Sequence, residues 1–228
     1  MTTCKASIVF YALSVIAFVI QCIWSVVGIS PFVRIALFIT VALCLHIGSV
    51  AKAQGRELQT AQRVMKNTYL LMFALYLLLF IALVFIDGYF AEDIRGNSGR
   101  TVESFKGYRE NYMSIVPFKT SGRLLYAAKM NWISPKKPLL NIGGNLLLCT
   151  PFAFFLPLFF KRQHNFFIFF FTVSGVSVLV ESIQLLTRRG FCDIDDLIFN
   201  VIGACVVHGL LHIAFLRKLT EKITKLQY

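Results

Sequence analysis

Two groups of polar side chains in the C-terminal part of the chain have the spacing of residues that share one face of a helix. Both follow the pattern i, i+3, i+7: Glu181, Gln184 and Arg188, and then Asp193, Asp196 and Asn200. These groups stand between two long apolar runs. An ionisable group buried in or beside a membrane span is costly without a partner, so it indicates a functional site. The pattern predicts two polar stripes side by side at one membrane surface.

The simpler interpretation is a polar turn in which Asp193 or Asp195 caps the second helix. Capping explains one carboxylate and leaves the matching stripes on both helices unexplained. On a helix, Asp195 is rotated about 100–200° away from its two acidic neighbours, so we expect it nearer to a cap or to water. Asp196 is expected to face the stripe that contains Glu181, where its charge needs a partner such as Arg188 or a cation.

These residue types suit two kinds of chemistry. Hard divalent cations such as Mg²⁺ prefer carboxylate oxygens, so the candidate catalytic residues and metal ligands are Glu181, Asp193 and Asp196. Arginines bind phosphates through charge-assisted hydrogen bonds, and amide side chains add further polar contacts. The candidate binding residues are Arg188 and Arg189, with Gln184, Asn200 and, in an earlier apolar window, Asn145.

The apolar content of the chain indicates an integral membrane protein. Of its 228 residues, 57% are hydrophobic and 15% are charged, against about 25% charged in globular proteins. Six windows lack Asp, Glu, Lys and Arg: 6–33, 35–51, 67–86, 138–160, 163–180 and 197–216. A span needs about 20 apolar residues, so the windows predict an all-α, polytopic helical bundle with about six transmembrane helices. The first window is too long for a signal-peptide core, and we expect it to remain as an anchor.

Basic residues set the expected topology. The net charge of +12 comes from Lys and Arg at helix ends, where they meet lipid head groups, so no nucleic-acid partner is expected. The positive-inside rule predicts both termini in the cytoplasm and residues 88–137 outside. Within that loop, we expect an extended apolar piece at 111–118 and an amphipathic interfacial helix at 120–133. Two spans separate the loop from the 188–195 turn, so both lie at the same face.

Histidine and proline residues in the spans have structural interpretations. His208 and His212 have ligand-like spacing, but Asp196 is about 18 Å from His208 along a helix, so we expect packing or interfacial roles for both. His46 is expected to be a satisfied interior residue. Pro151 removes a backbone hydrogen bond in mid-span, which a neighbouring group must replace.

Several short motifs occur together in the second part of the chain: Pro117-Phe118, Asn145 with Pro151, Glu181-x-x-Gln184, and Asp193-x-Asp195-Asp196 followed by Asn200 and Gly203. With these motifs the sequence resembles the VanZ-like family of bacterial membrane proteins. The resemblance covers about residues 67–216, with 1–66 as an N-terminal addition and 217–228 as a basic tail. It implies a bacterial plasma-membrane protein that reduces susceptibility to teicoplanin-type lipoglycopeptides. Family members usually carry Asn where this chain has Ser114, which adds Ser114 to the candidate binding residues.

Three functions are open at this point. A non-enzymatic envelope protein would bind a membrane lipid, a lipid-linked cell-wall precursor or a lipoglycopeptide at the outer face. A membrane enzyme would act on a lipid-linked phosphate with Mg²⁺ or another divalent cation, although no cofactor is certain. A transporter is less favoured, because the chain has no visible internal repeats. The sequence leaves the oligomeric state open.

Overall fold

The computed structural model describes residues 2–27, 31–86, 107, 109, 113–187 and 192–224. These residues are almost entirely helical, which confirms the expected all-α membrane bundle. The chain divides into two units, 1–79 with 218–228, and 80–217.

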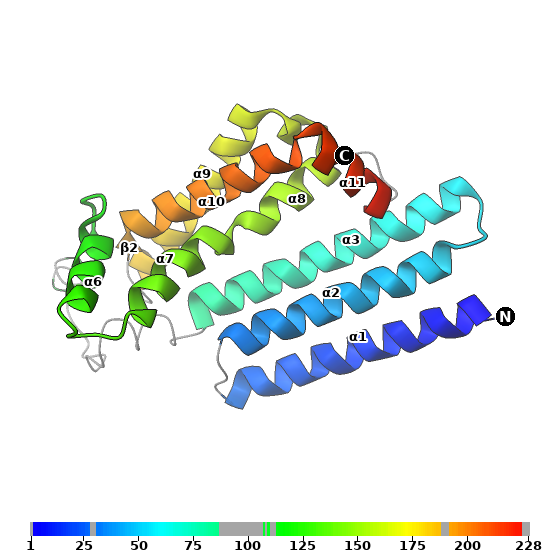
Figure 1. Cartoon of the computed structure of the whole chain (residues 1–228), viewed down its shortest axis with the longest axis horizontal. Helices are drawn as coiled ribbons and strands as arrows, with labels where there is room; N and C mark the ends of the chain where they lie inside the picture. The colour runs from blue at the N-terminus through cyan, green and yellow to red at the C-terminus, as the bar shows by residue number, and fades with distance from the viewer. Residues whose placement is uncertain are drawn as a thin grey trace. The chain divides into compact units, whose positions relative to one another are not determined.

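The N-terminal unit is built from three long helices, which Figure 1 shows side by side: α1 (Thr2–Val27), α2 (Pro31–Ala53) and α3 (Leu58–Ile81). A glycine allows α1 and α2 to approach closely. A Cβ atom on Gly48 would lie 3.2 Å from the Cβ of Phe10. His46 of α2 makes a 3.0 Å hydrogen bond with the hydroxyl of Tyr69 on α3, so it is a satisfied interior histidine, as expected.

The second unit is arranged around α10. After a π-helical turn at Ala82–Ile86, its elements are β1 (Met113–Ser114), α6 (Lys119–Lys129), α7 (Lys136–Leu148), α8 (Thr150–Phe159), a 3-10 turn (Lys161–His164), α9 (Phe166–Thr187), β2 (Cys192–Asp193) and α10 (Ile194–Leu211). α10 packs against α7, α8 and α9, and Figure 1 shows it running alongside α7 and α8. A last helix, α11 (Ala214–Thr224), follows. α6 begins one residue before the predicted amphipathic helix at 120–133 and ends four residues before its predicted end.

The fourth predicted span is broken into α7 and α8 at Cys149, just before Pro151. Proline has no N–H to donate to the carbonyl of Leu147, four residues earlier. The hydroxyl of Thr150 donates to that carbonyl instead, at 2.8 Å. A neighbouring side chain therefore replaces the missing backbone bond, and α7 and α8 together still form one candidate span, Lys136–Phe159.

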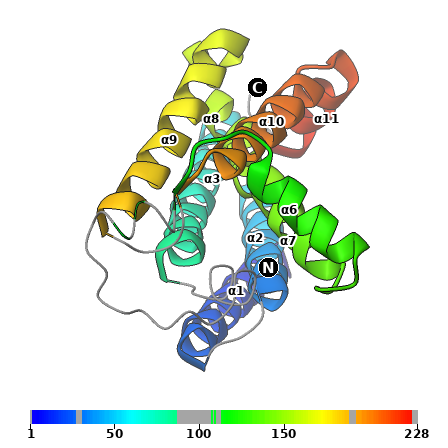
Figure 2. The same cartoon turned by 90° about the vertical axis from the view of Figure 1, so that its left-hand side faces the viewer.

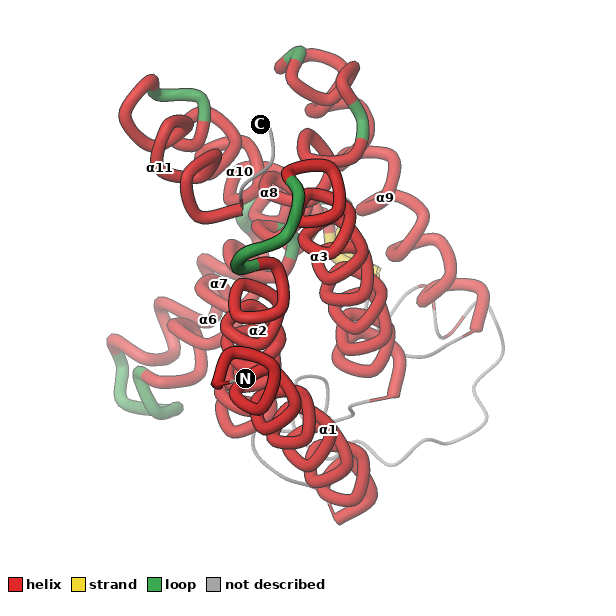
Figure 3. Tube along the Cα trace, turned by 90° about the vertical axis from the view of Figure 1, so that its right-hand side faces the viewer, coloured by secondary structure: helices red, strands yellow, loops and turns green. Residues whose placement is uncertain are grey.

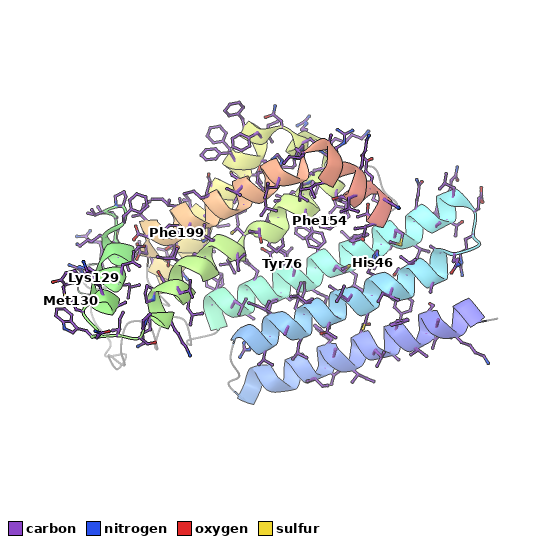
Figure 4. All side chains as sticks on the ribbon, in the orientation of Figure 1. His46, Tyr76, Lys129, Met130, Phe154 and Phe199 are labelled. Atoms are coloured by element: carbon purple, nitrogen blue, oxygen red, sulfur yellow. The ribbon has the colours of Figure 1, made fainter. Side chains whose placement is uncertain are left out.

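Within the described part of the chain, five helical segments are long and apolar enough to cross a membrane: Val33–Ala53, Leu58–Phe85, Lys136–Phe159, Phe166–Thr187 and Ile194–Leu211. The first predicted window is also helical, as α1, and contributes the shorter apolar helix Lys5–Ile20. Large apolar side chains on these helices point outward, including Leu70, Phe171 and Val206, each more than half exposed. Figure 4 shows such side chains along the outer surfaces of the helices. A lipid environment solvates such surfaces.

Candidate functional site

A two-residue parallel ladder joins the long loop to the turn between α9 and α10. Met113 pairs with Cys192 and Ser114 pairs with Asp193; the strands are drawn in yellow in Figure 3. Residues 113–114 are therefore extended, as predicted, whereas 116–118 form a bend and a turn, so the prediction is wrong for that part of 111–118. Residues 111–112 lie outside the described residues. The ladder places the backbone of Ser114 directly beside Asp193, one of the three acidic residues of the candidate site.

The carboxylate of Glu181 faces the start of α10. Glu181 is buried in α9, and its Oε2 accepts the backbone N–H of Asp193 at 2.8 Å. Asp193 is itself buried, and its Oδ1 accepts the N–H of Asp195 at 3.0 Å, which makes Asp193 the N-cap of α10. The capping interpretation is thus correct for Asp193, and the same residue also belongs to the acidic group.

Asp195 acts as a helix cap, which is one of the two roles expected for it, although it does not cap α10. It is fully buried, and its carboxylate accepts the backbone N–H groups of Phe118 and Ser121 and the hydroxyl of Ser121. It therefore caps α6, and the other expectation, exposure to water, is wrong for this residue. As expected, its side chain points away from the stripe that contains Asp196. On that side of α10 it meets α6, not water. Figure 2 shows α6 beside the N-terminal end of α10.

Phe118 begins α6 with a left-handed backbone, at a φ of 60°. A bulky residue in this region is strained by about 1–3 kcal/mol and persists where its surroundings hold it. Two contacts hold Phe118: its N–H donates to Asp195, and its ring packs edge-to-face on Phe199 of α10, with the centroids 6.3 Å apart. The Pro117-Phe118 motif is therefore the docking point of α6 on α10.

Asp196 makes its described hydrogen bond with a side chain of α7. The side-chain amide of Asn145 donates to its Oδ1 at 2.5 Å. Asp196 was expected to pair with Arg188 or a cation, and the described partner is an amide. Arg188 and Arg189 lie outside the described residues.

Three buried polar atoms on β1, α7 and α10 lack a hydrogen-bond partner among the described residues: Ser114 Oγ, Asn141 Oδ1 and Asn200 Oδ1. Asn141 precedes Asn145 by one helical turn on α7. Asn200 lies between Asp196 and Gly203 on α10, and both of those residues contact α7, so Asn200 also faces α7. Buried polar atoms are nearly always satisfied in native proteins, by protein, water or a ligand. A ligand or ordered water at this position would satisfy these atoms.

The pKa of the Cys192 thiol depends on the carboxylates of the site. Burial, and then the negative charges of Glu181, Asp193 and Asp196, raise the pKa of this thiol. Three carboxylates therefore act on one position in the turn between α9 and α10. The site is acidic at its centre.

The fit of a divalent cation can be tested against this arrangement. The three candidate ligands each direct one oxygen to a protein N–H: Glu181 to Asp193, Asp193 to Asp195, and Asp196 to Asn145. Among the described residues, no three His, Cys, Asp or Glu side chains form a group that could hold a metal ion. The described carboxylates therefore do not form a group of three metal ligands, and no catalytic step through a metal ion follows from their geometry.

Gln184 shares a helix face with Glu181, but its described hydrogen bond leads elsewhere. Its Nε2 donates to the carbonyl oxygen of Val84 at 3.3 Å. Gln184 therefore ties α9 to the π-helical turn after α3. Nothing among the described hydrogen bonds joins Gln184 to the carboxylates.

The histidines of α10 lie at its other end. His208 is buried, stacks on Phe169 with the centroids 4.2 Å apart, and contacts the carbonyl oxygen of Gln163 at 2.9 Å. His212 contacts His164 at 3.3 Å between ring nitrogens. Both make packing and polar contacts, which agrees with the first of the two roles expected, packing or interfacial. The contribution of His164 was not foreseen, because no local spacing connects it to α10.

Comparison with known proteins places the site inside a recognised domain. The model of the VanZ/LLP1 family matches residues 73–215, which is more than half of the chain and includes every candidate site residue. No curated protein and no solved structure matches the chain.

Proposed function

The chain belongs to the VanZ/LLP1 family, and we propose that it is a non-enzymatic envelope protein that binds a lipid, a lipid-linked precursor or a lipoglycopeptide. Through this binding it contributes to resistance to teicoplanin-type antibiotics. In this proposal the protein lies in the bacterial plasma membrane with both termini in the cytoplasm. The acidic site then faces the outside.

The observation that carries the proposal is the set of buried polar atoms without described partners on the elements that also carry Asp193, Asn145 and Asp196 or pair with them. Ser114, Asn141 and Asn200 each contribute one such atom. They come from three segments of the chain that the fold brings to one end of the second unit. Leaving a buried polar atom unsatisfied costs about 1–3 kcal/mol. A polar head group that donates hydrogen bonds to these oxygens and to the carboxylates would remove this cost.

The surroundings suit an amphiphilic ligand that also carries phosphate. α6 and the start of α7 present exposed basic residues, among them Lys119, Arg123 and Lys136, which can bind phosphate oxygens. Beside them, Trp132 and Leu125 are 73% and 53% exposed, as expected of side chains at the boundary between head groups and acyl chains. Hydroxyl donors, phosphate and an apolar tail occur together in lipid-linked precursors.

The test compares purified full-length protein with two variants that lose the same charge. Asp196→Asn changes the site, and Glu57→Gln changes an exposed carboxylate between α2 and α3. The probes are teicoplanin, an undecaprenyl-diphosphate-linked cell-wall precursor and phosphatidylglycerol. We expect Asp196→Asn to weaken binding of one probe about tenfold or more, because it removes a charged acceptor, and Glu57→Gln to leave binding unchanged.

The same variants are then compared for growth in teicoplanin at matched membrane abundance. Asp196→Asn should abolish the protection that the wild type gives. Equal binding of all three probes by wild type and Asp196→Asn would contradict the proposal.

A further inference from the structure

A polar pocket lies within the N-terminal unit, outside the residues 73–215 that the family model matches. It has a volume of about 250 Å³ and is lined mainly by Ser7, Ile8, Tyr11, Lys52, Gln54 and Arg56. A single water needs only about 10–15 Å³ of such space, and drug-sized ligands occupy pockets of about 300–1,000 Å³. The pocket therefore suits a small group such as a head group, and is too small for a lipoglycopeptide.

Contacts between α1, α2 and α3 hold the wall of this pocket in place. The close approach of α1 and α2 at Gly48 sets Tyr11 against α2. The Tyr11 hydroxyl makes a 2.9 Å hydrogen bond with Ser49, which in turn bonds Thr68 of α3 at 2.6 Å. The aromatic ring of Tyr11 is therefore fixed, and the ammonium nitrogen of Lys52 lies 5.7 Å from its centre. This cation–π contact keeps Lys52 at the pocket.

The charge of the pocket is positive. Lys52 and Arg56 line it, and none of the described lining residues is acidic. Ser7 and Gln54 add hydrogen-bonding groups. Arg and Lys together with a hydroxyl and an amide form a donor set for phosphate oxygens.

The pocket also lies where two apolar helical segments end. The candidate span of α2 ends at Ala53, and the apolar part of α1 begins at Lys5, which is the position where head groups meet a helix that crosses a membrane. Ile8, which lines it, is 62% exposed, so an accessible apolar side chain lies beside the basic ones. A phospholipid could place its phosphate on Lys52 and Arg56 with its chains along α1.

We propose that the pocket between the start of α1 and the end of α2 binds a phosphate-bearing anionic group, supplied by a phospholipid head group or by free phosphate. This site is independent of the acidic site in the second unit. In this proposal the N-terminal helices form a module that binds a phospholipid or phosphate and is attached to the family domain.

The experiment uses the full chain in detergent with three probes: short-chain phosphatidylglycerol, short-chain phosphatidylcholine and inorganic phosphate. The pocket variant is Lys52→Gln with Arg56→Gln. The matched control is Arg63→Gln with Lys66→Gln, which removes the same charge from exposed positions on α3 outside the pocket. Native mass spectrometry measures the bound probe, and thermal unfolding verifies that each variant is folded.

We expect the pocket variant to bind phosphatidylglycerol about tenfold or more weakly, because two charge-assisted contacts are lost, while the control binds as the wild type does. A third variant, Lys52→Arg with Arg56→Lys, keeps the charge and should retain binding. Stronger binding of phosphatidylglycerol than of phosphate identifies the lipid as the source, and equal binding identifies free phosphate. Equal losses in pocket and control variants, or wild-type binding by the pocket variant, would overturn the proposal.

Discussion

Ser121 donates both its backbone N–H and its hydroxyl to the carboxylate of Asp195, at 2.9 and 2.8 Å, although the two residues are 74 positions apart in the chain. Asp195 thereby caps a helix of the long loop from the first turn of α10. A negative side chain at a helix N-terminus satisfies free N–H groups and complements the helix dipole. α6 and the acidic site are therefore coupled through adjacent residues, Asp195 and Asp196.

This relationship predicts that Asp195→Asn destabilises the protein. Asparagine keeps one acceptor oxygen and places an NH₂ group against the N–H donors of α6, so donors face donors at a fully buried position. We expect a loss of about 2–5 kcal/mol in the free energy of unfolding, together with lower membrane abundance. Unfolding of the purified protein in mixed micelles at increasing SDS measures the first quantity.

Two other variants give this prediction its controls. Ser121→Ala removes one of the three described donors and should cost less, about 1 kcal/mol. Asp196→Asn makes the same chemical change one residue later, where the Asn145 amide can still donate to the remaining oxygen, so stability should change little. If Asp195→Asn and Asp196→Asn were equally stable, the cap would not hold α6 as described.

Cys192 provides a chemical probe of the acidic site. Its pKa is raised, first by burial and then by Glu181, Asp193 and Asp196, so less thiolate is present at a given pH above neutrality than for an exposed cysteine. The thiolate is the reactive form. We expect slow modification by iodoacetamide at pH 8 and faster modification in Glu181→Gln, which removes one negative charge. Mass spectrometry of the peptide that contains Cys192 measures both rates, and unchanged rates in the variant would contradict the charge cluster.

His164 predicts how stability depends on pH at the opposite end of the second unit. Burial, and then the positive charges of His212 and Arg217, lower the pKa of His164 below its ordinary value of 6.5, although a hydrogen bond to the backbone of Pro157 opposes them. The folded state therefore binds a proton less readily than the unfolded state. Stability is fully present above pH 6.5 and falls as the pH drops below that value towards the folded pKa.

Thermal unfolding between pH 7.5 and pH 5.5 measures this dependence. The wild type should unfold at a lower temperature at pH 5.5, and His164→Gln should show a smaller difference between the two pH values. A variant with the same pH dependence as the wild type would show that His164 does not contribute.

The sequence was informative wherever the relevant contact is local. Apolar windows predicted the helices because burial in lipid depends on runs of residues, and the N-cap of Asp193 follows from its place before α10. The role of Asp195 was not predictable in this way. Helical spacing showed that the side chain of Asp195 lies on another face of the helix than Asp196. Only the tertiary fold determines that α6 packs against that face. The β1–β2 ladder was missed for the same reason, because two residues carry no periodic signal.

Gly203 closes the motif of α10 and sets the distance between α10 and α7. A Cβ atom at this position would lie 1.8 Å from the carbonyl oxygen of Leu146 and 2.7 Å from its carbonyl carbon. Backbone atoms cannot rotate away, so Gly203→Ala must separate the two helices. We expect a loss of about 1–3 kcal/mol in stability and weaker binding, because the Asn145–Asp196 hydrogen bond spans the same interface.

Gly209, two turns later on the same helix, is the matched control. A Cβ atom there would meet nothing within 4 Å, so Gly209→Ala should be neutral or stabilise the helix by up to about 1 kcal/mol. SDS unfolding and probe binding are measured for both variants. Because both substitutions add one methyl group to α10, a difference between them isolates the contact with Leu146. Equal stability and equal binding would show that the close approach of α7 and α10 is not required for the site.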